Sequence, residues 1–395
     1  MQLNTLIVIV LLSGTITVAQ ERKISSKVNP GCKTCTNDTI LMYVRCDGAS
    51  DTIHQIWDFT RSIPTVIFAV SKLKSSLDIV WDGNNPTGFY MSETPLYSFA
   101  TALDKIYEYN DLKDNGHFDP NLPHRIHNLD HMVWHVKEIS TTEKEAMVQV
   151  YGTLNNDRSE EHGTVAIKLD LIPFKDYSVE LPHLIHTANS TQLDVSLVNL
   201  TSTPGYNASR FALHLLLVST DSATETMRYT MRKSLDDEHT PGVFEVIEIK
   251  TPALHNYAIG GYLQFRPVGY VQAERGVASS TIAHVSYFNR TSLPVRSTLK
   301  TFYDEFGRAN LLVQDMVVSF GEGGDGYYAQ HNYTAWSFAV GYGSPPTDSF
   351  SWYVVLIISG GLLLPVLLAV SGMVYVLVRR HRQRYNSRAM FANED

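Results

Sequence analysis

The sequence predicts a mainly β protein, with an antiparallel, sandwich-like ectodomain of one or two sheets and one C-terminal transmembrane helix. Three observations predict this fold class. Many short stretches carry apolar residues at every second position, which is typical of strands with one buried face. The chain lacks the regular alternation of strands and helices that builds parallel sheets. It also has a long uncharged apolar stretch near its end.

The transmembrane helix is predicted over residues 353–378. No charged residue occurs from Tyr353 to Val378. A helix of this length spans roughly 39 Å, which exceeds the hydrocarbon core of about 30 Å. The basic cluster Arg379-Arg380-His381-Arg382-Gln383-Arg384 follows directly. Because basic flanks stay on the cytosolic side of a membrane, residues 379–395 are predicted to form a cytosolic tail.

Four small or kinking residues in this helix are spaced by four, four and three positions, which places them on one face: Gly361, Pro365, Ala369 and Gly372. Small residues let two helices approach closely in lipid, so this face is a candidate for packing against a partner helix. Small residues are also common in membrane helices generally, and the sequence leaves both interpretations open.

The chain start resembles an export signal. The apolar run Leu6–Leu12 precedes small residues that end at Ala19, which predicts a signal peptide over 1–19. An uncleaved second membrane helix is the alternative, but the apolar run is short for a span. Residues 20–352 are then the luminal, β-rich domain of a single-pass type I protein.

The charge balance excludes some partners. The whole chain has a formal net charge of −8, and the basic tail leaves the ectodomain more acidic still. An acidic ectodomain argues against binding nucleic acid or anionic lipid head groups. Most of the 15 histidines precede the helix, and below about pH 6 they are expected to become charged and offset the acidic balance.

Six asparagines in the ectodomain stand in Asn-x-Ser/Thr sequons and are predicted glycosylation sites: Asn37, Asn189, Asn199, Asn207, Asn289 and Asn332. Asn85-Pro-Thr is excluded by its proline. All six lie on the side that the helix argument assigns to the lumen. A heavily glycosylated surface is therefore expected.

The three cysteines are Cys32, Cys35 and Cys46. One disulfide and one remaining thiol is the simplest arrangement in an exported chain, and the pairing is left open. Cys32-Lys-Thr-Cys35 has the spacing of a redox motif, but no βαβ pattern surrounds it. A local structural bridge is favoured over redox or metal chemistry.

Strands are predicted along most of the ectodomain. Three stretches alternate strictly between apolar and other residues, 146–151, 165–171 and 193–197, and Asp194 and Ser196 are expected on a wetter face. Other β-rich runs are Ile40–Cys46, Thr65–Val70, Leu77–Trp81, Phe211–Val218, Val243–Ile249, Ser279–Tyr287 and Leu311–Ser319.

Helix and loop predictions are fewer. Ala100–Tyr109 is the best helix candidate before the membrane span, although it also fits a strand, and Asn110–Leu129 is expected to be loop. A subdivision of the domain is predicted near 173–182, where Pro173 and Pro182 interrupt the pattern. The cluster Gly321–Gly326 lacks the lysine of a phosphate loop and predicts a tight turn between strands.

Two clusters invite a catalytic or metal assignment. His124, His127, Asp130, His131 and His135 offer enough ligands for a metal, but Pro123 and the extended pattern of Val133–Ile139 are expected to scatter them. The run Asp236-Asp237-Glu238-His239 is interpreted as a solvated turn, not a carboxylate pair for catalysis. We therefore predict no catalytic residue, no metal site, no cofactor and no enzymatic activity.

Several stretches together resemble the glycosylated lysosomal membrane protein family. The resemblance rests on Leu184-Ile-His-Thr-Ala-Asn189 with Gln192-Leu-Asp-Val195, Ser234–Phe244, Phe265–Gln272, and Gly326–His331 through Trp336-Ser337 to Pro345-Pro346. Ile53-His-Gln-Ile-Trp57, Pro64 and Trp81 also fit. Because the matches occur in order along the ectodomain, the chain is identified as a member of this family.

The resemblance implies a type I lysosomal glycoprotein without enzymatic activity. It also implies a partner, a lysosomal major-facilitator-superfamily transporter that exports dipeptides, which the luminal domain protects from proteolysis. Family members can end in a Tyr-x-x-bulky sorting signal, whereas Tyr385-Asn-Ser-Arg388 places a charge at the last position. This difference favours the main alternative, a cell-surface receptor or adhesion-type β-sandwich glycoprotein.

Overall fold

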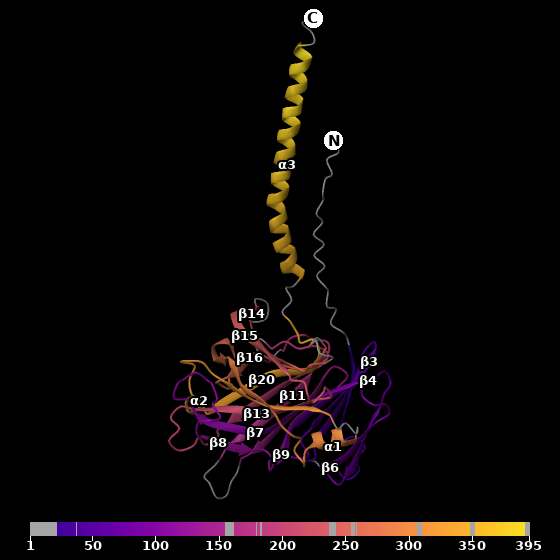
Figure 1. The fold of residues 1–395 in the computed structure, drawn as a ribbon, viewed down its shortest axis with the longest axis vertical. Helices are drawn as coiled ribbons and strands as arrows, with labels where there is room; N and C mark the ends of the chain where they lie inside the picture. The colour runs from indigo at the N-terminus through magenta and orange to yellow at the C-terminus, as the bar shows by residue number, and fades with distance from the viewer. Residues whose placement is uncertain are drawn as a thin grey trace. The chain divides into compact units, whose positions relative to one another are not determined.

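The computed structural model describes residues 22–36, 38–154, 162–178, 180–181, 184–236, 242–253, 257, 259–305, 310–347 and 352–391. The chain divides into two compact units, Met1–Thr347 and Asp348–Asp395. The predicted signal peptide, 1–19, lies outside the described residues. The first unit is built from antiparallel strands, which confirms the predicted fold class (Figure 1).

The first sheet, sheet 1, is formed mainly by the N-terminal half of the chain. In spatial order its strands are β1 (Lys23–Val28), β2 (Leu41–Asp47), β3 (Asp51–Asp58), β4 (Thr65–Lys72), β7 (Tyr97–Asn110), β13 (Ser209–Ser219), β19 (Leu312–Phe320) and β18 (Ala283–Arg290). The short strand β8 (His124–Asn128) pairs with β7. The predicted strand runs 40–46, 65–70, 211–218 and 311–319 are all confirmed within this sheet.

The second sheet, sheet 2, brings together two groups of strands. Its order is β14 (Arg228–Asp236), β15 (Gly242–Lys250), β16 (Gly260–Tyr270), β20 (Tyr333–Gly343), β12 (Ser190–Val198), β11 (Thr164–Leu171), β10 (Ala146–Thr153) and β9 (Trp134–Thr141). The two-residue strand β17 (Ser280–Thr281) pairs with β16. β20 pairs with β12 on one side and with β16 on the other, so it joins the two groups.

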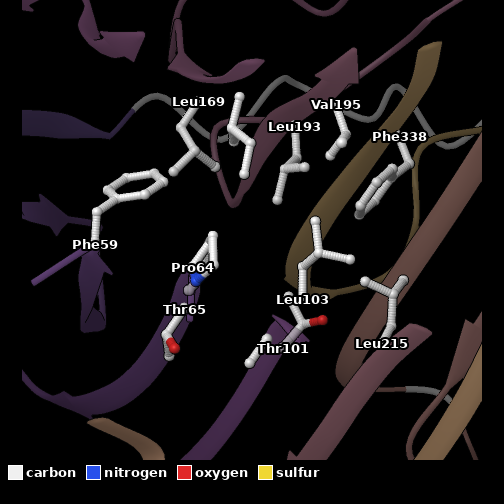
Figure 2. Close-up of a pocket in the computed structure, with 13 residues that line it drawn as sticks. Phe59, Pro64, Thr65, Thr101, Leu103, Leu169, Leu193, Val195, Leu215 and Phe338 are labelled. Carbon is white, nitrogen blue, oxygen red and sulfur yellow. The ribbon is translucent and has the colours of Figure 1, made fainter. Parts of the chain in front are cut away.

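The two sheets pack face to face around the main hydrophobic core. Phe59, Leu103 and Leu215, on the sheet 1 side, point toward Leu193 and Phe338 of sheet 2 across a cavity of about 20 Å³ (Figure 2). A space of this size holds no more than a water molecule. The alternating residues of β10 and β11 therefore bury one face in a closely packed sandwich core, as their period of two predicts.

Glycine is required where β16 of sheet 2 packs against β7 of sheet 1. A Cβ atom at Gly261 in β16 would lie 2.0 Å from Cγ of Phe99 in β7. Real side chains do not approach this closely, so only glycine allows the ring of Phe99 to pack directly on the backbone of β16.

The outer face of sheet 1 is covered by further apolar residues. The hairpin of β5 (Leu77–Asp82) and β6 (Asn85–Met91) and the helix α1 (Thr298–Glu305) contact each other over this face (Figure 1). Phe89 and Phe302 meet edge to face with ring centroids 5.7 Å apart. They form a second core with Ile56, Ile67 and Leu216 of sheet 1. Both faces of sheet 1 are thus buried against apolar groups.

The outer face of sheet 2 is held by ion pairs and hydrogen bonds. Arg275 forms a two-pronged salt bridge with Asp194, with N–O distances of 2.6 and 2.7 Å, and Nη2 of Arg275 also donates to Ser196 and Tyr333. Asp194 and Ser196, predicted to lie on a wetter face, are therefore buried. The residue that covers them lies about eighty positions away in the sequence.

Two sequence predictions are wrong in part. Ala100–Tyr109 belongs to the 14-residue strand β7 and is not a helix. Its apolar residues do not alternate strictly, because both faces of this central strand are buried. The expected loop 110–129 contains β8. The described residues of the predicted subdivision, 173–178 and 180–181, lie in the connection between β11 and β12, two strands that pair directly.

The second unit contains the helix α3 (Trp352–Phe391), shown in yellow in Figure 1. Leu356–Arg384 is long and apolar enough to cross a membrane, and its apolar window is not buried. The predicted transmembrane helix 353–378 is thus part of a longer helix that continues through the basic cluster. Pro365 lies inside it.

Candidate functional site

The small residues predicted to contact a partner helix lie within α3. Gly361, Pro365, Ala369 and Gly372 fall on one side of a continuous helix, and all four are exposed. No described atom outside the local helix backbone lies within 4 Å of a Cβ atom placed at Gly361 or Gly372. This face can therefore accept the close approach of another helix in a membrane.

Four of the six predicted glycosylation sites are exposed asparagines: Asn199, Asn207, Asn289 and Asn332. They occur in both sheets or next to their strands: Asn289 on β18, Asn199 directly after β12, Asn207 shortly before β13, and Asn332 directly before β20. Asn37 lies outside the described residues. Glycans at the exposed positions would cover several separate parts of the surface.

Asn189 differs from these four. It is half-buried, and its side-chain oxygen accepts a hydrogen bond from Nε of Arg22. Arg22 is buried and forms a salt bridge of 2.7 Å with Asp51. Sequence reasoning missed this contact because the two residues lie far apart in the chain. Asn189 therefore contributes to the packing of the first described residues against sheet 2, in addition to being a predicted glycan acceptor.

The cysteine pairing is now clear. Cys32 and Cys35 form a disulfide, and Cys46 is a buried free thiol in β2. The disulfide closes the turn that follows β1, next to the β5–β6 hairpin, where Thr34 donates to the carbonyl oxygen of Gly83. This arrangement fits a local structural bridge. Burial raises the pKa of the Cys46 thiol to about 12, which keeps it protonated and unreactive.

The histidine cluster is dispersed by the fold. His124 and His127 lie on β8 of sheet 1, whereas His135 lies on β9 of sheet 2, which confirms the extended structure expected there. His131 is exposed in the connection. Among the residues that the structure describes, no group of three or more His, Cys, Asp or Glu side chains could hold a metal ion. Asp237, Glu238 and His239 of the acidic run lie outside the described residues.

Two other histidines change the expected response to acid. Burial lowers the pKa of His54 to about 4, and burial likewise lowers the pKa of His186 to about 4. The sequence-based expectation that the ectodomain histidines become charged below about pH 6 is therefore wrong for these two. Both histidines therefore stay neutral at pH 5 to 6.

The predicted turn at Gly321–Gly326 is confirmed and is held by a buried cation. Arg210 forms ion pairs with Asp111, Asp114 and Asp325 at 2.9, 2.7 and 2.8 Å. These contacts tie the glycine-rich turn after β19 to the loop after β7. Because one guanidinium forms charge-assisted hydrogen bonds with three carboxylates, it holds these loops together.

These features define a class of protein. It is a β-sandwich with exposed sequon asparagines, and its described residues include one helix that is apolar and long enough to span a membrane. A family model described as "Glycosylated lysosomal membrane protein" matches residues 40–383. The chain belongs to this family. The family name describes a membrane glycoprotein and not an enzyme.

Individual relatives match over nearly their whole length. The chain is 29% identical over 388 residues to glycosylated lysosomal membrane protein B of Xenopus laevis, which covers 94% of this chain and 93% of that protein. It is 27% identical over 380 residues to the protein of Danio rerio, with coverage of 92% and 90%. It is 25% identical over 359 residues to the protein of Homo sapiens, with coverage of 88% and 85%.

Proposed function

We propose that this protein is a non-catalytic accessory subunit of a major-facilitator-superfamily transporter that exports dipeptides from the lysosome. In this proposal the sandwich domain is luminal, the tail after α3 is cytosolic, and the domain protects the transporter from luminal proteases. Membership of a lysosomal membrane glycoprotein family supports the compartment. The basic cluster after the apolar part of α3 supports the orientation.

The observation that carries the proposal is the combination of exposed sequon asparagines with a closely paired sandwich. Proteases bind extended, accessible backbone, and they cleave at exposed loops and termini. Here the strands pair with neighbours in two large sheets, and Asn199, Asn207, Asn289 and Asn332 are placed to carry sugars next to strand ends. Such a domain is well suited to persist among proteases and to shield a less protected neighbour.

The exposed small-residue face of α3 provides a contact for that neighbour. Replacing Gly361 and Ala369 with leucine adds bulk to this face and should reduce co-purification of the transporter from native membranes. Val370→Leu with Val374→Leu is a matched control, because these positions lie on the opposite face of the helix. Equal recovery of the transporter with both double variants would argue against this contact.

Removal of the protein from cells tests the function itself. We expect the transporter identified by cross-linking to be degraded faster, and dipeptide export from lysosomes to fall with it. An unchanged transporter half-life would contradict the protective role. Imaging at endogenous expression level separates this proposal from the cell-surface receptor alternative, which requires residence in the plasma membrane.

A further inference from the structure

The helix α3 does not end where its apolar residues end. It continues without a break from the apolar stretch through the basic cluster to Phe391. Residues 379–384 of this helix are exposed, and we call them the basic collar. No Asp or Glu occurs anywhere within α3 to offset their charge. The collar contains four arginines: Arg379, Arg380, Arg382 and Arg384.

The arginines of the basic collar form two pairs on different sides of the helix. Residues three or four positions apart are neighbours on a helix surface, with Cβ atoms about 5–6 Å apart. Arg379 and Arg382 form one such pair. Arg380 and Arg384 form the other. At about 100° per residue, the midpoints of the two pairs are about 150° apart around the helix axis. A protein surface that packs on one side of the helix therefore contacts only one pair.

All four arginines lie at nearly the same depth relative to the apolar stretch. Arg379 follows Val378 directly, and at about 1.5 Å per residue Arg384 is only about 8 Å further along the axis. The head-group layer on each side of a bilayer is about 5–8 Å thick. When the apolar stretch crosses a bilayer, both arginine pairs therefore lie among the lipid head groups.

We propose that the basic collar binds two anionic phospholipids, one at each arginine pair, and that phosphatidylserine is the lipid it selects. A guanidinium group binds phosphate and carboxylate oxygens through two parallel hydrogen bonds, and phosphatidylserine presents both groups. The inference requires α3 to span a membrane, which membership of a membrane glycoprotein family supports. It goes beyond the accessory function proposed above and depends neither on the transporter nor on the direction in which α3 crosses.

Other occupants fit the basic collar less well. A phosphoinositide concentrates several charges on one head group, whereas the arginines are divided between two sides of the helix. Phosphatidylcholine has no net charge to attract them. An acidic protein surface would contact one pair and leave the other exposed. The signal that stops translocation needs positive charge only, and it does not require the helix to continue through the charged residues.

The experiment uses the full-length protein reconstituted into phosphatidylcholine bilayers with a trace of spin-labelled lipid. Electron paramagnetic resonance measures the fraction of labelled lipid that the protein immobilises. One arginine near an anionic head group strengthens association about fivefold. At about 0.01 M salt we therefore expect labelled phosphatidylserine to be preferred over labelled phosphatidylcholine at least about fivefold, at two sites per protein. At about 1 M salt the preference should disappear, because the Debye length falls to about 3 Å.

Two double variants test the assignment of the sites. Arg379→Gln with Arg382→Gln should remove one of the two preferred sites. Arg380→Gln with Arg384→Gln should remove the other. Each double variant keeps two arginines directly after the apolar stretch, so the charge that orients α3 in the membrane is retained. The remaining site should bind phosphatidylserine as it does in the unchanged protein.

Lys23→Gln with Lys27→Gln is the matched control, because it removes two exposed cationic side chains from β1. Both lipid sites should be unchanged in this variant. A phosphoinositide bisphosphate added at equal total charge should compete no better than phosphatidylserine. The inference is wrong if phosphatidylserine is not preferred, if neither arginine variant loses a site, if the lysine variant loses as much, or if the bisphosphate displaces phosphatidylserine from both sites.

Discussion

The outer faces of the two sheets are stabilised by different physical means. Sheet 1 is covered by the β5–β6 hairpin and α1, which bury aromatic and aliphatic side chains. Sheet 2 instead carries Arg275, Lys168 and their carboxylate partners around a polar cavity. The outer face of sheet 1 depends on apolar burial and that of sheet 2 on charge pairing. The stability of the two faces should therefore respond differently to mutation and to pH.

Truncation of the apolar cover should have the largest effect. Phe302 in α1 is fully buried against Phe89, and Phe302→Ala should lower the free energy of unfolding by about 4 kcal/mol. Denaturant unfolding measures the change. Val295→Ala is the control, because Val295 is 80% exposed. If both variants unfold alike, α1 does not stabilise sheet 1 as described.

Breaking the ion pair between Arg275 and Asp194 in sheet 2 should lower the free energy of unfolding slightly less than Phe302→Ala does. Arg275→Met leaves the buried carboxylate of Asp194 without its partner, which should destabilise the protein by about 3 kcal/mol. The double variant with Asp194→Asn should recover part of this loss in the same denaturation experiment, because it removes the unpaired charge. A double variant as unstable as the single one would show that Arg275 acts through packing alone.

Acid should weaken the covered face of sheet 1. His54 lies on that face, where Nδ1 contacts the hydroxyl of Tyr43 at 2.7 Å and Nε2 contacts the hydroxyl of Ser71 at 2.9 Å. Burial lowers its pKa to about 4. His54 therefore binds a proton more tightly in the unfolded chain than in the folded one. As the pH falls from about 6.5 to 4, the free energy of unfolding should decrease by about 3 kcal/mol.

His54→Gln should remove this part of the acid dependence, measured as the slope of unfolding free energy against pH. His131→Gln is the control, since the side chain of His131 is 92% exposed. A slope that persists in His54→Gln would assign the acid sensitivity to other groups, of which His186 is the first candidate.

The polar face of sheet 2 should respond in the opposite direction. Because burial raises the pKa of Asp170 to about 6, the folded state binds its proton more tightly than the unfolded chain does. The ionised carboxylate of Asp170 therefore destabilises the folded state. This destabilisation is fully present above pH 6 and disappears as the pH falls toward 4. Asp170→Asn should therefore stabilise the protein by about 2 kcal/mol at pH 7.5 and by nearly nothing at pH 4. Equal stabilisation at both pH values would contradict the assignment.

The smallest effect is expected at the four exposed glycan acceptors, which lie outside both cores. Asn207 is exposed, and Asn207→Gln should remove one glycan, visible as a step in electrophoretic mobility, while stability changes by less than about 0.5 kcal/mol. Asn85→Gln is the control, because proline follows Asn85 and should prevent modification. No step with Asn207→Gln would show that this sequon is unused.

Predictions from the sequence are correct where a short stretch carries the whole pattern, and they fail where the structure depends on residues far apart in the chain. The strands β10 and β11 alternate because one face meets the core, and α3 is uncharged over a long stretch, so both could be predicted. The strand β7 could not be separated from a helix, because burial on both faces removes the alternation. Burial of Asp194 could not be foreseen, since Arg275 comes from a distant loop.

The candidate sites differ in the same way. The sequons and the small-residue face of α3 are short motifs that a sequence displays directly. The cavity on sheet 2 is assembled from β11, β12, their connection, Arg275, and Glu145 of the β9–β10 loop. Neither Asp170 nor Gln192 carries a recognisable motif, and their juxtaposition on the outer face of sheet 2 becomes visible only in the folded arrangement.

The position of β20 has a consequence for biosynthesis. The ribosome makes this strand after every other strand, yet it is the one that links the β9–β12 group to the β14–β16 group. Sheet 2 therefore cannot close while translation of the preceding three hundred or so residues is under way. A nonsense mutation just before Tyr333 should therefore leave the two groups without the strand that joins them, with unpaired strand edges that favour aggregation.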